Sequence, residues 1–402
     1  MTGPDPFIVQ PIVGTLDSTV ILPGSKSLTN RALIVAALAD GTSVLRGVGL
    51  SDDTEAMMGA LRGLGIQVEV AGTMVTVHGR GGRVDVPAES LDANMSGTSA
   101  RFLLPMLAVA GAGTLTGHAQ MRGRPMADLT EALRGLGAAL EGDALPITVG
   151  SGITTRSVSI GAEISSQFIS GLLLSAPAFP FGLELTLVGS PVSQPYIDMT
   201  IAVMHAFGAE VDVEPSRIIV APVAYKAIEY LIEPDASTAS YPLAAAAIVG
   251  GRVTVAGLGS RSVQGDADFA NRVLSPMGAS VFVDETSIEV RGSGNLDALT
   301  VDLRDMSDTA PTFAALAAKA RGKSSVHGIG FIRTTKESDR VQGSVDELRR
   351  LGIAASVDSD GFSVVGGPHM HAAIETSDDH RMAMGFALIG LTGGSLAVDD
   401  PD

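Results

Sequence analysis

The sequence contains no cysteine and no tryptophan. Without a thiol the chain can form no disulfide, no zinc–thiolate centre and no cysteine nucleophile. Aromatic residues make up only 4% of the 402 positions, which argues against a protein that binds nucleic acid on aromatic platforms. The formal net charge of −17 argues against binding a phosphate backbone over a broad face. An anionic ligand would therefore need a local group of cations.

Long apolar runs are scarce as well. The run ALIVAALA, which begins at Ala32, falls well short of the ~20 residues that span a bilayer. The first ten residues, MTGPDPFIVQ, lack the charged segment and apolar core of a signal peptide. We therefore expect a soluble cytoplasmic protein without a membrane role, and the length predicts two domains.

Glycine, in contrast, is abundant, and it marks an internal repeat. Alternating β-type runs begin at six glycines, which are Gly41, Gly113, Gly182, Gly251, Gly322 and Gly394. An alanine-rich apolar helix pattern precedes each run, and a second helical pattern, more exposed and ending in glycine, follows the first five. The fourth of these exposed helices is expected over residues 267–278. An ordinary doubly wound α/β protein could show one or two such coincidences. Six units in the same order predict two α/β domains with three βαβ-type units each.

The residues that precede the six apolar helices are rich in serine, threonine and aspartate. Such residues are common N-caps, worth ~0.5–2 kcal/mol each, and capping explains many of them. It does not explain Lys26, Arg31, Arg101 and Arg381, because cations at a helix N-terminus oppose the helix dipole. A bound anion between these cations and the helix amides would explain them.

Two further stretches add cations. MRGRPM places Arg122 and Arg124 before a helix. In RTTKESDR, residues 333–340, the favoured interpretation of the stretch alone is a solvated helix start with an Asp339–Arg340 surface pair. Lys336 and Arg340 are four residues apart, however, so one helical face could present both to a ligand. The sequence shows no complete dinucleotide, P-loop or calcium motif.

Eight motifs resemble, in their order, the signatures of the 5-enolpyruvylshikimate-3-phosphate (EPSP) synthase family, the 3-phosphoshikimate 1-carboxyvinyltransferases. They are PGSKSLTNRALIVAALADG, SGTSARF, GRPM, SSQF, PYIDMT, DASTASYPLAAAAI, KESDR and DDHRMAM. The resemblance implies the enolpyruvyl transferase fold, with two inside-out α/β domains of three repeats each. One domain would span residues 24–234, and a discontinuous one would combine residues 1–23 with 235–402.

The resemblance also implies the reaction. A carboxyvinyl group would pass from phosphoenolpyruvate to the 5-hydroxyl of shikimate 3-phosphate through a tetrahedral intermediate, with release of phosphate. The reaction belongs to the shikimate pathway, which leads to chorismate and the aromatic amino acids. The resemblance implies that the reaction needs no metal and no organic cofactor. We expect these two small molecules as partners, no nucleic acid, and a monomer.

The resemblance also implies roles for individual residues, at the positions of this sequence that match the family's motifs. The resemblance assigns phosphoenolpyruvate binding to Lys26, Gly97, Arg124, Gln167, Arg340 and Arg381. It assigns shikimate 3-phosphate binding to Lys26, Ser27, Arg31, Ser165, Ser166, Gln167, Ser193, Tyr196, Asp308 and Lys336. Catalysis falls to Asp308 as the base near the attacking hydroxyl, to Glu337 as the acid–base group at the methylene carbon, and to Lys336 and Lys26.

Three departures from the family pattern stand out. Phe102 occupies a position where many members have proline, and Ile332 replaces an asparagine that contacts shikimate 3-phosphate. The sequence ends at VDDPD, so the sixth unit lacks its exposed helix and the lysine of the family's K-x-FP stretch. We expect an incomplete sixth repeat and a less stable C-terminal domain. Because Gly97 has no side chain to obstruct the phosphoenolpyruvate pocket, we expect glyphosate to inhibit.

Two alternatives remain open at this point. A truncated protein could bind shikimate 3-phosphate with little or no turnover. The sister enzyme that acts on UDP-N-acetylglucosamine has the same six repeats, but its usual members use a cysteine, which this chain lacks.

Overall fold

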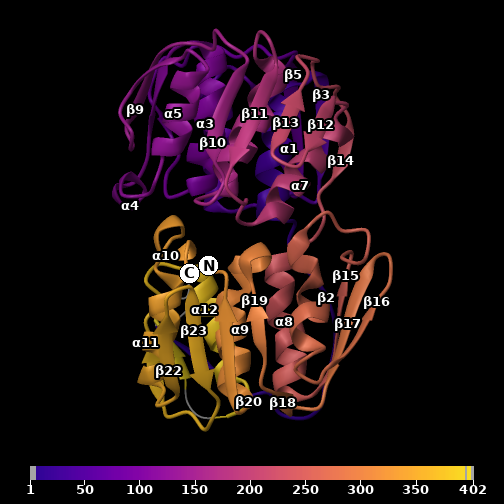
Figure 1. The fold of residues 1–402 in the computed structure, drawn as a ribbon. Coiled ribbons are helices and arrows are strands. Elements are labelled where there is room, and N and C mark those ends of the chain that lie inside the picture. Colours follow the sequence, from indigo (N-terminus) through magenta and orange to yellow (C-terminus); the bar gives the residue numbers. More distant parts are fainter. Residues whose placement is uncertain (1–5, 394–395, 400–402) are drawn as a thin grey trace. The chain divides into compact units, whose positions relative to one another are not determined.

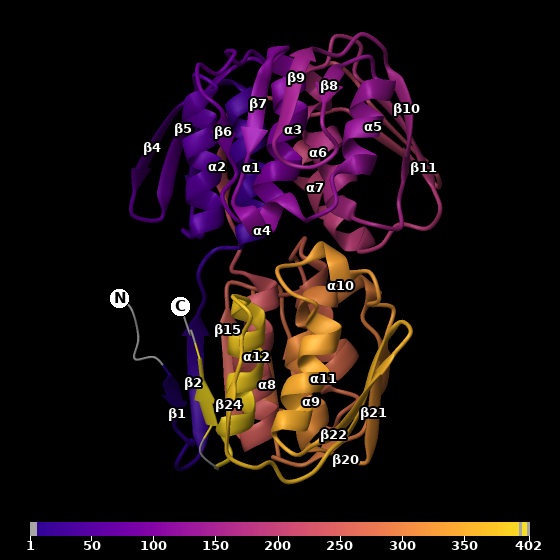
Figure 2. The same ribbon diagram turned by 90° about the vertical axis from the view of Figure 1, so that its left-hand side faces the viewer.

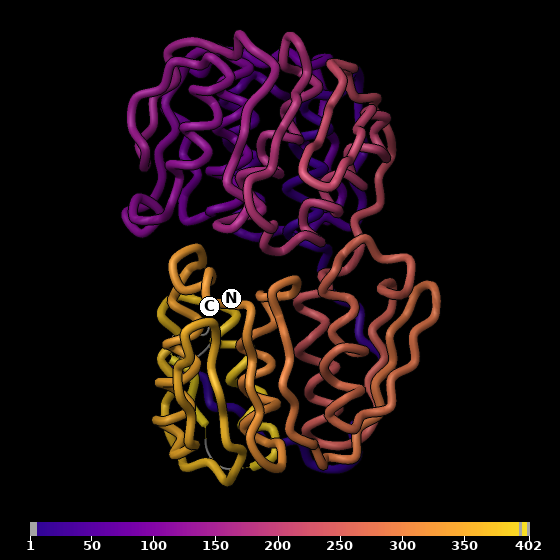
Figure 3. The backbone as a smooth tube through the Cα atoms, viewed as in Figure 1, coloured from indigo at the N-terminus to yellow at the C-terminus, as the bar shows by residue number. Residues whose placement is uncertain are grey.

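The computed structural model describes residues 6–393 and 396–399. The chain divides into two compact units, Pro23–Asp235 and a discontinuous one of Met1–Leu22 with Ala236–Asp402. The chain passes from one unit to the other twice, between Leu22 and Pro23 and between Asp235 and Ala236, and its course can be followed in Figure 3. That these units are the two expected domains of three repeats each, 24–234 and 1–23 with 235–402, stays a prediction.

Three helices form the centre of the unit Pro23–Asp235, and strands lie around them (Figures 1 and 2). They are α1 (Lys26–Leu38), α3 (Gly97–Ala110) and α6 (Ser166–Ser175), which continues into the 3₁₀ helix η1 (Ala176–Ala178). Their residues are apolar on most faces, so nearly all of them are buried. The more exposed helices are α2 (Asp52–Gly63), the short α4 (Ala119–Arg122), α5 (Ala127–Gly135) and α7 (Gln194–Ala206).

This unit has three four-stranded sheets with one topology. The first is β14 (Glu229–Leu231), β3 (Asp40–Arg46), β5 (Met74–Arg80) and β4 (Gln67–Ala71). The second is β6 (Leu91–Asp92), β7 (Gly113–Thr116), β9 (Ile147–Ser151) and β8 (Ala139–Glu141). The third is β10 (Ser157–Gly161), β11 (Leu183–Val188), β13 (Arg217–Val220) and β12 (Val211–Glu214). In each, the first two strands are parallel and the others antiparallel.

The discontinuous unit repeats this arrangement around α8 (Ala236–Val249), α9 (Ala310–Lys319) and α12 (His380–Gly390). One sheet is β2 (Leu16–Ile21), β15 (Gly251–Ala256), β17 (Ser287–Gly292) and β16 (Ser280–Val283). Another is β19 (Thr300–Asp302), β21 (Lys323–His327), β23 (Gly361–Val365) and β22 (Ala354–Asp358). A three-stranded sheet orders β1 (Phe7–Val9), β25 (Leu396–Val398) and β24 (Ala372–Ile374), and β18 (Leu296–Asp297) pairs with β20 (Ala320–Arg321). This unit also contains η4 (Arg304–Thr309), α10 (Ile332–Thr335) and α11 (Arg340–Arg350).

The repeated α/β architecture confirms the fold expected from the glycine-led units. One expected element differs. The fourth exposed helix, expected over residues 267–278, consists of the 3₁₀ turn η2 (Gly265–Asp268) and the wide π-type turn η3 (Ala270–Leu274). Ser275 donates to the carbonyl of Ala270, and Pro276 has no N–H to continue a regular α-helix. Of the expected sixth strand and tail, Gly394, Ser395 and residues 400–402 lie outside the described residues.

Glycine allows the central helices to approach closely. A Cβ at Gly171 of α6 would lie 2.3 Å from the carbonyl oxygen of Arg101 in α3. In the other unit, a Cβ at Gly385 of α12 would lie 2.9 Å from the backbone of Pro311 in α9. These contacts fix where the N-terminal ends of the central helices lie, and those ends carry the candidate site residues.

Candidate active site

Serine side chains cap the central helices of the unit Pro23–Asp235. Ser25 accepts from the amide of Leu28, Ser96 from that of Ser99, and Ser165 from that of Gln167. The expectation that capping explains many of these polar residues is therefore confirmed. Lys26 follows its cap directly, and its Nζ lies 2.7 Å from Oδ2 of Asp53 in α2. No local sequence pattern predicts Asp53 as the partner of Lys26, because the two residues lie in separate helices.

Arg31 lies one turn further along α1 and is 1% exposed. Its Nε donates to Thr200 at 2.8 Å, its Nη1 to the carbonyl of Ser27 at 2.9 Å, and its Nη2 to the carbonyl of Tyr196 at 3.2 Å. Burial lowers the pKa of Arg31 to about 10, and the neighbouring Tyr196 offsets part of that shift. No carboxylate pairs with Arg31 in the part of the chain that the structure describes. A buried cation with only neutral partners favours an anionic ligand.

A second cationic cluster surrounds the start of α3. Arg101 donates from Nη1 to the side-chain oxygen of Gln167, and Gln167 donates to Thr98 at 3.1 Å. Arg124 Nη1 donates to the carbonyl of Met95 at 3.4 Å, while its buried Nη2 meets no acceptor among the described residues. A Cβ at Gly97 would lie 3.1 Å from Arg101 Nη1 and 3.2 Å from Arg124 Nη1. Only glycine leaves this space between the two guanidinium groups open.

The candidate serines lie at the ends of α6 and α7. Ser165, Ser166 and Ser193 are all buried, and Ser193 adopts a left-handed φ of 55°. Such a conformation is strained for a residue with a side chain, and strained residues cluster at functional sites. The ring centroid of Tyr196 lies 5.9 Å from Cζ of Arg31. Ser27 is half-buried, and its carbonyl accepts from Arg31.

The discontinuous unit carries its own charged cluster, centred on Asp308. Lys336 Nζ lies 2.6 Å from Oδ1, Arg340 Nη1 2.9 Å from Oδ1, and Arg381 Nη2 3.0 Å from Oδ2 of Asp308. Burial by itself would raise the pKa of Asp308. The positive charges of Arg381, Lys336 and Arg340 outweigh it and hold that pKa well below its usual value. Asp308 is therefore an ionised acceptor.

Asp379 orders the two arginines of this cluster, and the sequence reasoning did not single it out. Its carboxylate accepts from Arg340 Nε at 2.8 Å, from Ser338 at 2.9 Å and from the backbone amide of Arg381 at 3.0 Å. Its side chain is 0% exposed. Ser377 and Asp378, just before it, both have positive φ values, 55° and 54°. The acidic pair in DDHR was the only sequence signal that could have pointed to Asp379.

The stretch 333–340 differs from the favoured interpretation. Asp339 pairs with Arg333 at 2.9 Å and caps α11 by accepting from the amide of Gln342, so the Asp339–Arg340 surface pair is wrong. Arg340 is buried instead, and its Nη2 lies 2.6 Å from Glu337. The one-face argument is wrong as well, because α11 begins at Arg340 and leaves Lys336 outside it. Lys336 lies outside α11 and Arg340 within it, and both contact Asp308. Ile332, at the position of the family asparagine, is fully buried.

Tyr241 of α8 lies near Arg381, Arg340 and Asp308. Burial raises the pKa of its phenol, and the nearby charges of Arg381 and Arg340 offset part of that shift. The phenol is thus a neutral group beside the cations. Within the described ranges, no three histidine, aspartate or glutamate side chains gather so that they could hold a metal ion. No helix there has the length and apolar character needed to cross a bilayer.

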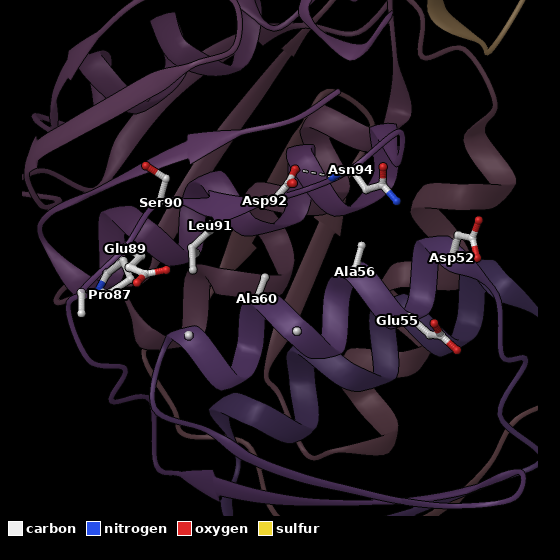
Figure 4. A pocket seen from close by; sticks show the side chains of 13 residues that line it. Asp52, Glu55, Ala56, Ala60, Pro87, Glu89, Ser90, Leu91, Asp92 and Asn94 are labelled. Carbon is white, nitrogen blue, oxygen red and sulfur yellow. Dashed lines mark hydrogen bonds between the residues drawn. The ribbon is translucent and has the colours of Figure 1, made fainter. Parts of the chain in front are cut away.

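A separate groove of ≈ 620 Å³ lies between α2 and the segment 87–94 (Figure 4). The small residues Ala56, Gly59, Ala60 and Gly63 form its floor along α2. Its charged lining residues are all acidic, and they are Asp52, Glu55, Glu89 and Asp92. This lining does not suit an anionic substrate, whereas the surroundings of Arg31, Arg124, Arg340 and Arg381 do.

Comparison with known proteins agrees with the family that the sequence motifs resemble. The family model described as EPSP synthase (3-phosphoshikimate 1-carboxyvinyltransferase) matches residues 11–402. The chain belongs to the EPSP synthase family. A 3-phosphoshikimate 1-carboxyvinyltransferase of Methanosphaerula palustris is 38% identical, with 96% of this chain and 93% of the relative covered. One of Trichormus variabilis is 39% identical, with 99% and 95% covered.

Solved structures agree with this assignment to the EPSP synthase family. EPSP synthase from Acinetobacter baumannii superposes with a TM-score of 0.82 at 26% identity, and 99% of this chain and 94% of that chain are covered. The enolpyruvyl transferase NikO from Streptomyces tendae superposes with a TM-score of 0.75 at 17% identity, with 99% and 94% covered. At that identity, NikO supports the fold alone. The enolpyruvyl transferase fold expected from the motifs is thus confirmed.

Proposed function

We propose that this chain transfers the carboxyvinyl group of phosphoenolpyruvate to the 5-hydroxyl of shikimate 3-phosphate and releases phosphate. The observation that carries the proposal is the match to the EPSP synthase family over residues 11–402, because that family's name states the transfer of a carboxyvinyl group to 3-phosphoshikimate. Two relatives that are 38% and 39% identical carry the same name, and the similarity covers nearly their full length. Both substrates are polyanions, and the buried cations described above fit that charge.

The binding roles follow from charge and position. Arg31, with Ser27, Ser165, Ser166, Ser193 and Tyr196, would bind shikimate 3-phosphate, with Lys26, Gln167, Asp308 and Lys336 at the same ligand. Arg31 supports this role because it is buried and faces only neutral partners. Lys26, Gly97, Arg124, Gln167, Arg340 and Arg381 would bind phosphoenolpyruvate. Arg124 supports this role because its buried Nη2 has no acceptor among the described residues.

The proton transfers would fall to the carboxylates of the second cluster. Asp308, held ionised by Arg381, Lys336 and Arg340, would accept the proton of the attacking 5-hydroxyl. Glu337, which contacts Arg340, would give a proton to the methylene carbon on addition and take one back on elimination. Lys336 and Lys26 would stabilise the negative charge that develops on the transferring group. No step in this scheme needs a metal or an organic cofactor.

No observation favours the two alternatives, a non-catalytic binding protein or an enzyme for UDP-N-acetylglucosamine. One experiment separates all three functions. The chain is incubated with phosphoenolpyruvate and either acceptor, and the products are identified by mass spectrometry and NMR. We expect an enolpyruvyl ether only from shikimate 3-phosphate. A product from the amino sugar, or shikimate 3-phosphate binding without any product, would contradict the proposal.

Lys26 offers a direct test of the binding roles, because the chain contains a matched control. Replacing Lys26→Met removes the cation that pairs with Asp53, and we expect the kcat to fall at least about tenfold. Lys323→Met removes an exposed lysine on β21, and we expect an unchanged kcat. Equal kinetics of the two variants would remove Lys26 from the proposed machinery.

The remaining parts of the proposal concern the setting of the reaction. We propose a cytoplasmic monomer whose partners are the two substrates. Light scattering after gel filtration checks the oligomeric state. A mass near 41.0 kDa is expected, and a mass of two chains would contradict it.

A further inference from the structure

A phenylalanine lies against the buried arginine of α1. Phe102 belongs to α3 and is 0% exposed, and its ring centroid lies 5.3 Å from Cζ of Arg31. An arginine within about 6 Å of an aromatic centroid is attracted to the negative face of the ring. The contact joins α1 and α3 at the ends where the candidate ligands lie.

The other partners of Arg31 are neutral. Thr200, Ser170 and the carbonyls of Ser27 and Tyr196 accept its hydrogen bonds, and no carboxylate does so among the described residues. These bonds use all three nitrogens, and Nη1 retains a second N–H. No anionic side chain compensates the charge, and two aromatic rings meet the guanidinium, Phe102 at 5.3 Å and Tyr196 at 5.9 Å from Cζ. Phe102 is the nearer of the two.

The position of Phe102 is itself fixed. Helix α3 approaches α6 so closely that a Cβ at Gly171 would lie 2.3 Å from the carbonyl oxygen of Arg101 and 3.5 Å from Cδ1 of Phe102. The ring of Phe102 therefore lies next to the α6 backbone at Gly171. Many EPSP synthases have proline at this position, and a proline ring offers no π face to a guanidinium.

We propose that Phe102 is a positioning residue that holds the Arg31 guanidinium in the orientation in which it binds the anionic acceptor. The inference rests on the proposed function, in which Arg31 binds shikimate 3-phosphate. It goes beyond that function because it assigns a specific role to a residue at which this chain departs from the family pattern. The ring contributes through Arg31 and does not touch the substrate.

The test compares two buried phenylalanines of the same unit. Phe102→Leu removes the ring beside Arg31, and Phe207→Leu removes a fully buried ring that packs against Tyr230 at 5.5 Å instead. The dissociation constant of shikimate 3-phosphate is measured calorimetrically without phosphoenolpyruvate. We expect it to rise roughly fivefold in Phe102→Leu, as the loss of one desolvated cation–π contact predicts. We expect no rise in Phe207→Leu.

Kinetics supply a readout that a general loss of packing would not produce. In Phe102→Leu the KM for shikimate 3-phosphate should rise, while the kcat and the KM for phosphoenolpyruvate stay unchanged. Phe102→Tyr keeps the ring face and should restore affinity. Melting temperatures of all variants identify any that is not folded. In Arg31→Lys, which lacks the planar group, adding Phe102→Leu should have little further effect.

The outcomes separate this inference from the proposed function. An equal dissociation constant in Phe102→Leu and Phe207→Leu, or an effect confined to phosphoenolpyruvate, would overturn the role of Phe102 while leaving the reaction intact. Failure of the unmodified chain to bind shikimate 3-phosphate would overturn both. Binding that depends on Phe102, without turnover, would support the inference and contradict the reaction.

Discussion

Three cations surround the carboxylate of Asp308. Arg381, Lys336 and Arg340 hold its pKa well below 3.8 against the effect of burial, whereas an unfolded aspartate titrates near ~3.9. A carboxyl with a depressed folded pKa stabilises the fold above the unfolded pKa, and that stability is lost as the pH falls through the folded pKa. The free energy of unfolding should therefore decrease below about pH 4.

Asp308→Asn should remove part of this pH dependence and lower the stability at neutral pH. Urea unfolding of both proteins between neutral pH and the acid limit measures it. The control is Asp305→Asn, a nearby aspartate without an ion pair among the described residues, which should keep the slope of the unmodified chain. An identical acid slope in Asp308→Asn would contradict the electrostatic account of this cluster.

Asp379 gives a second prediction at the residue scale. Its buried carboxylate accepts hydrogen bonds from the side chain of Arg340 and from the backbone amide of Arg381. Asp379→Asn should raise the KM for phosphoenolpyruvate and lower the free energy of unfolding by about 1.5–3 kcal/mol, because the buried Arg340 loses one of its three carboxylate partners and keeps the other two. Steady-state kinetics and urea unfolding check both.

Glu347 supplies the matched control. It is a buried carboxylate in α11, the helix that begins at Arg340, and it pairs with Arg350 at 3.1 Å. Glu347→Gln should lose stability without a change in the KM for phosphoenolpyruvate. If both variants raised that KM equally, the effect of Asp379→Asn would reflect general destabilisation rather than the position of Arg340.

Gly97 gives the third prediction. In Gly97→Ala the new Cβ would lie 3.1 Å from Arg101 and 3.2 Å from Arg124, so it narrows the space between the two guanidinium groups. The unmodified chain should be inhibited by glyphosate. The substitution should raise both the glyphosate inhibition constant and the KM for phosphoenolpyruvate, but leave the dissociation constant of shikimate 3-phosphate unchanged. A glyphosate inhibition constant far above the KM for phosphoenolpyruvate in the unmodified chain would contradict the open pocket.

At the scale of elements, the close approach of α3 and α6 can be tested with two glycines in helices. Gly171→Ala places a Cβ 2.3 Å from the carbonyl oxygen of Arg101, and we expect a loss of about 1–3 kcal/mol in unfolding free energy. Gly59→Ala in α2 meets no atom within 4 Å, so helix propensity should stabilise it by about 0.5–1 kcal/mol. Thermal and urea unfolding measure both signs. A stabilised Gly171→Ala would contradict the described helix packing.

The sequence predicted the elements well where their signals are local. Glycine-led alternation located β3, β7, β11, β15 and β21, and final glycines such as Gly65 and Gly352 have the positive φ of helix ends, 77° and 78°. The prediction failed where a single residue changed the local geometry. Pro276 interrupts the fourth exposed helix, and the Asp339 cap starts α11 after Lys336.

The partners of the site cations could not be predicted, because they come from distant segments. Asp53 reaches Lys26 from another helix, and Asp379 reaches Arg340 across 39 positions. Phe102 was noted only as a departure from the family. Its contact with Arg31 depends on how α1 and α3 pack, which no local pattern encodes.

At the scale of the whole molecule, strands distant in sequence complete the sheets. β14 pairs with β3 within Pro23–Asp235, where Tyr230 lies opposite Leu45. In the discontinuous unit, β2 pairs with β15 and β1 with β25. The proposed residues divide between the units, with Arg31 and Arg124 in one and Asp308, Arg340 and Arg381 in the other. We propose that both sets serve one reaction.

The central claim is tested most directly by phosphate release from phosphoenolpyruvate, measured with and without shikimate 3-phosphate in the unmodified chain. The account predicts steady release that requires shikimate 3-phosphate, and one enolpyruvyl product for each phosphate. Release that does not depend on shikimate 3-phosphate, or no release although both substrates bind, would contradict the account.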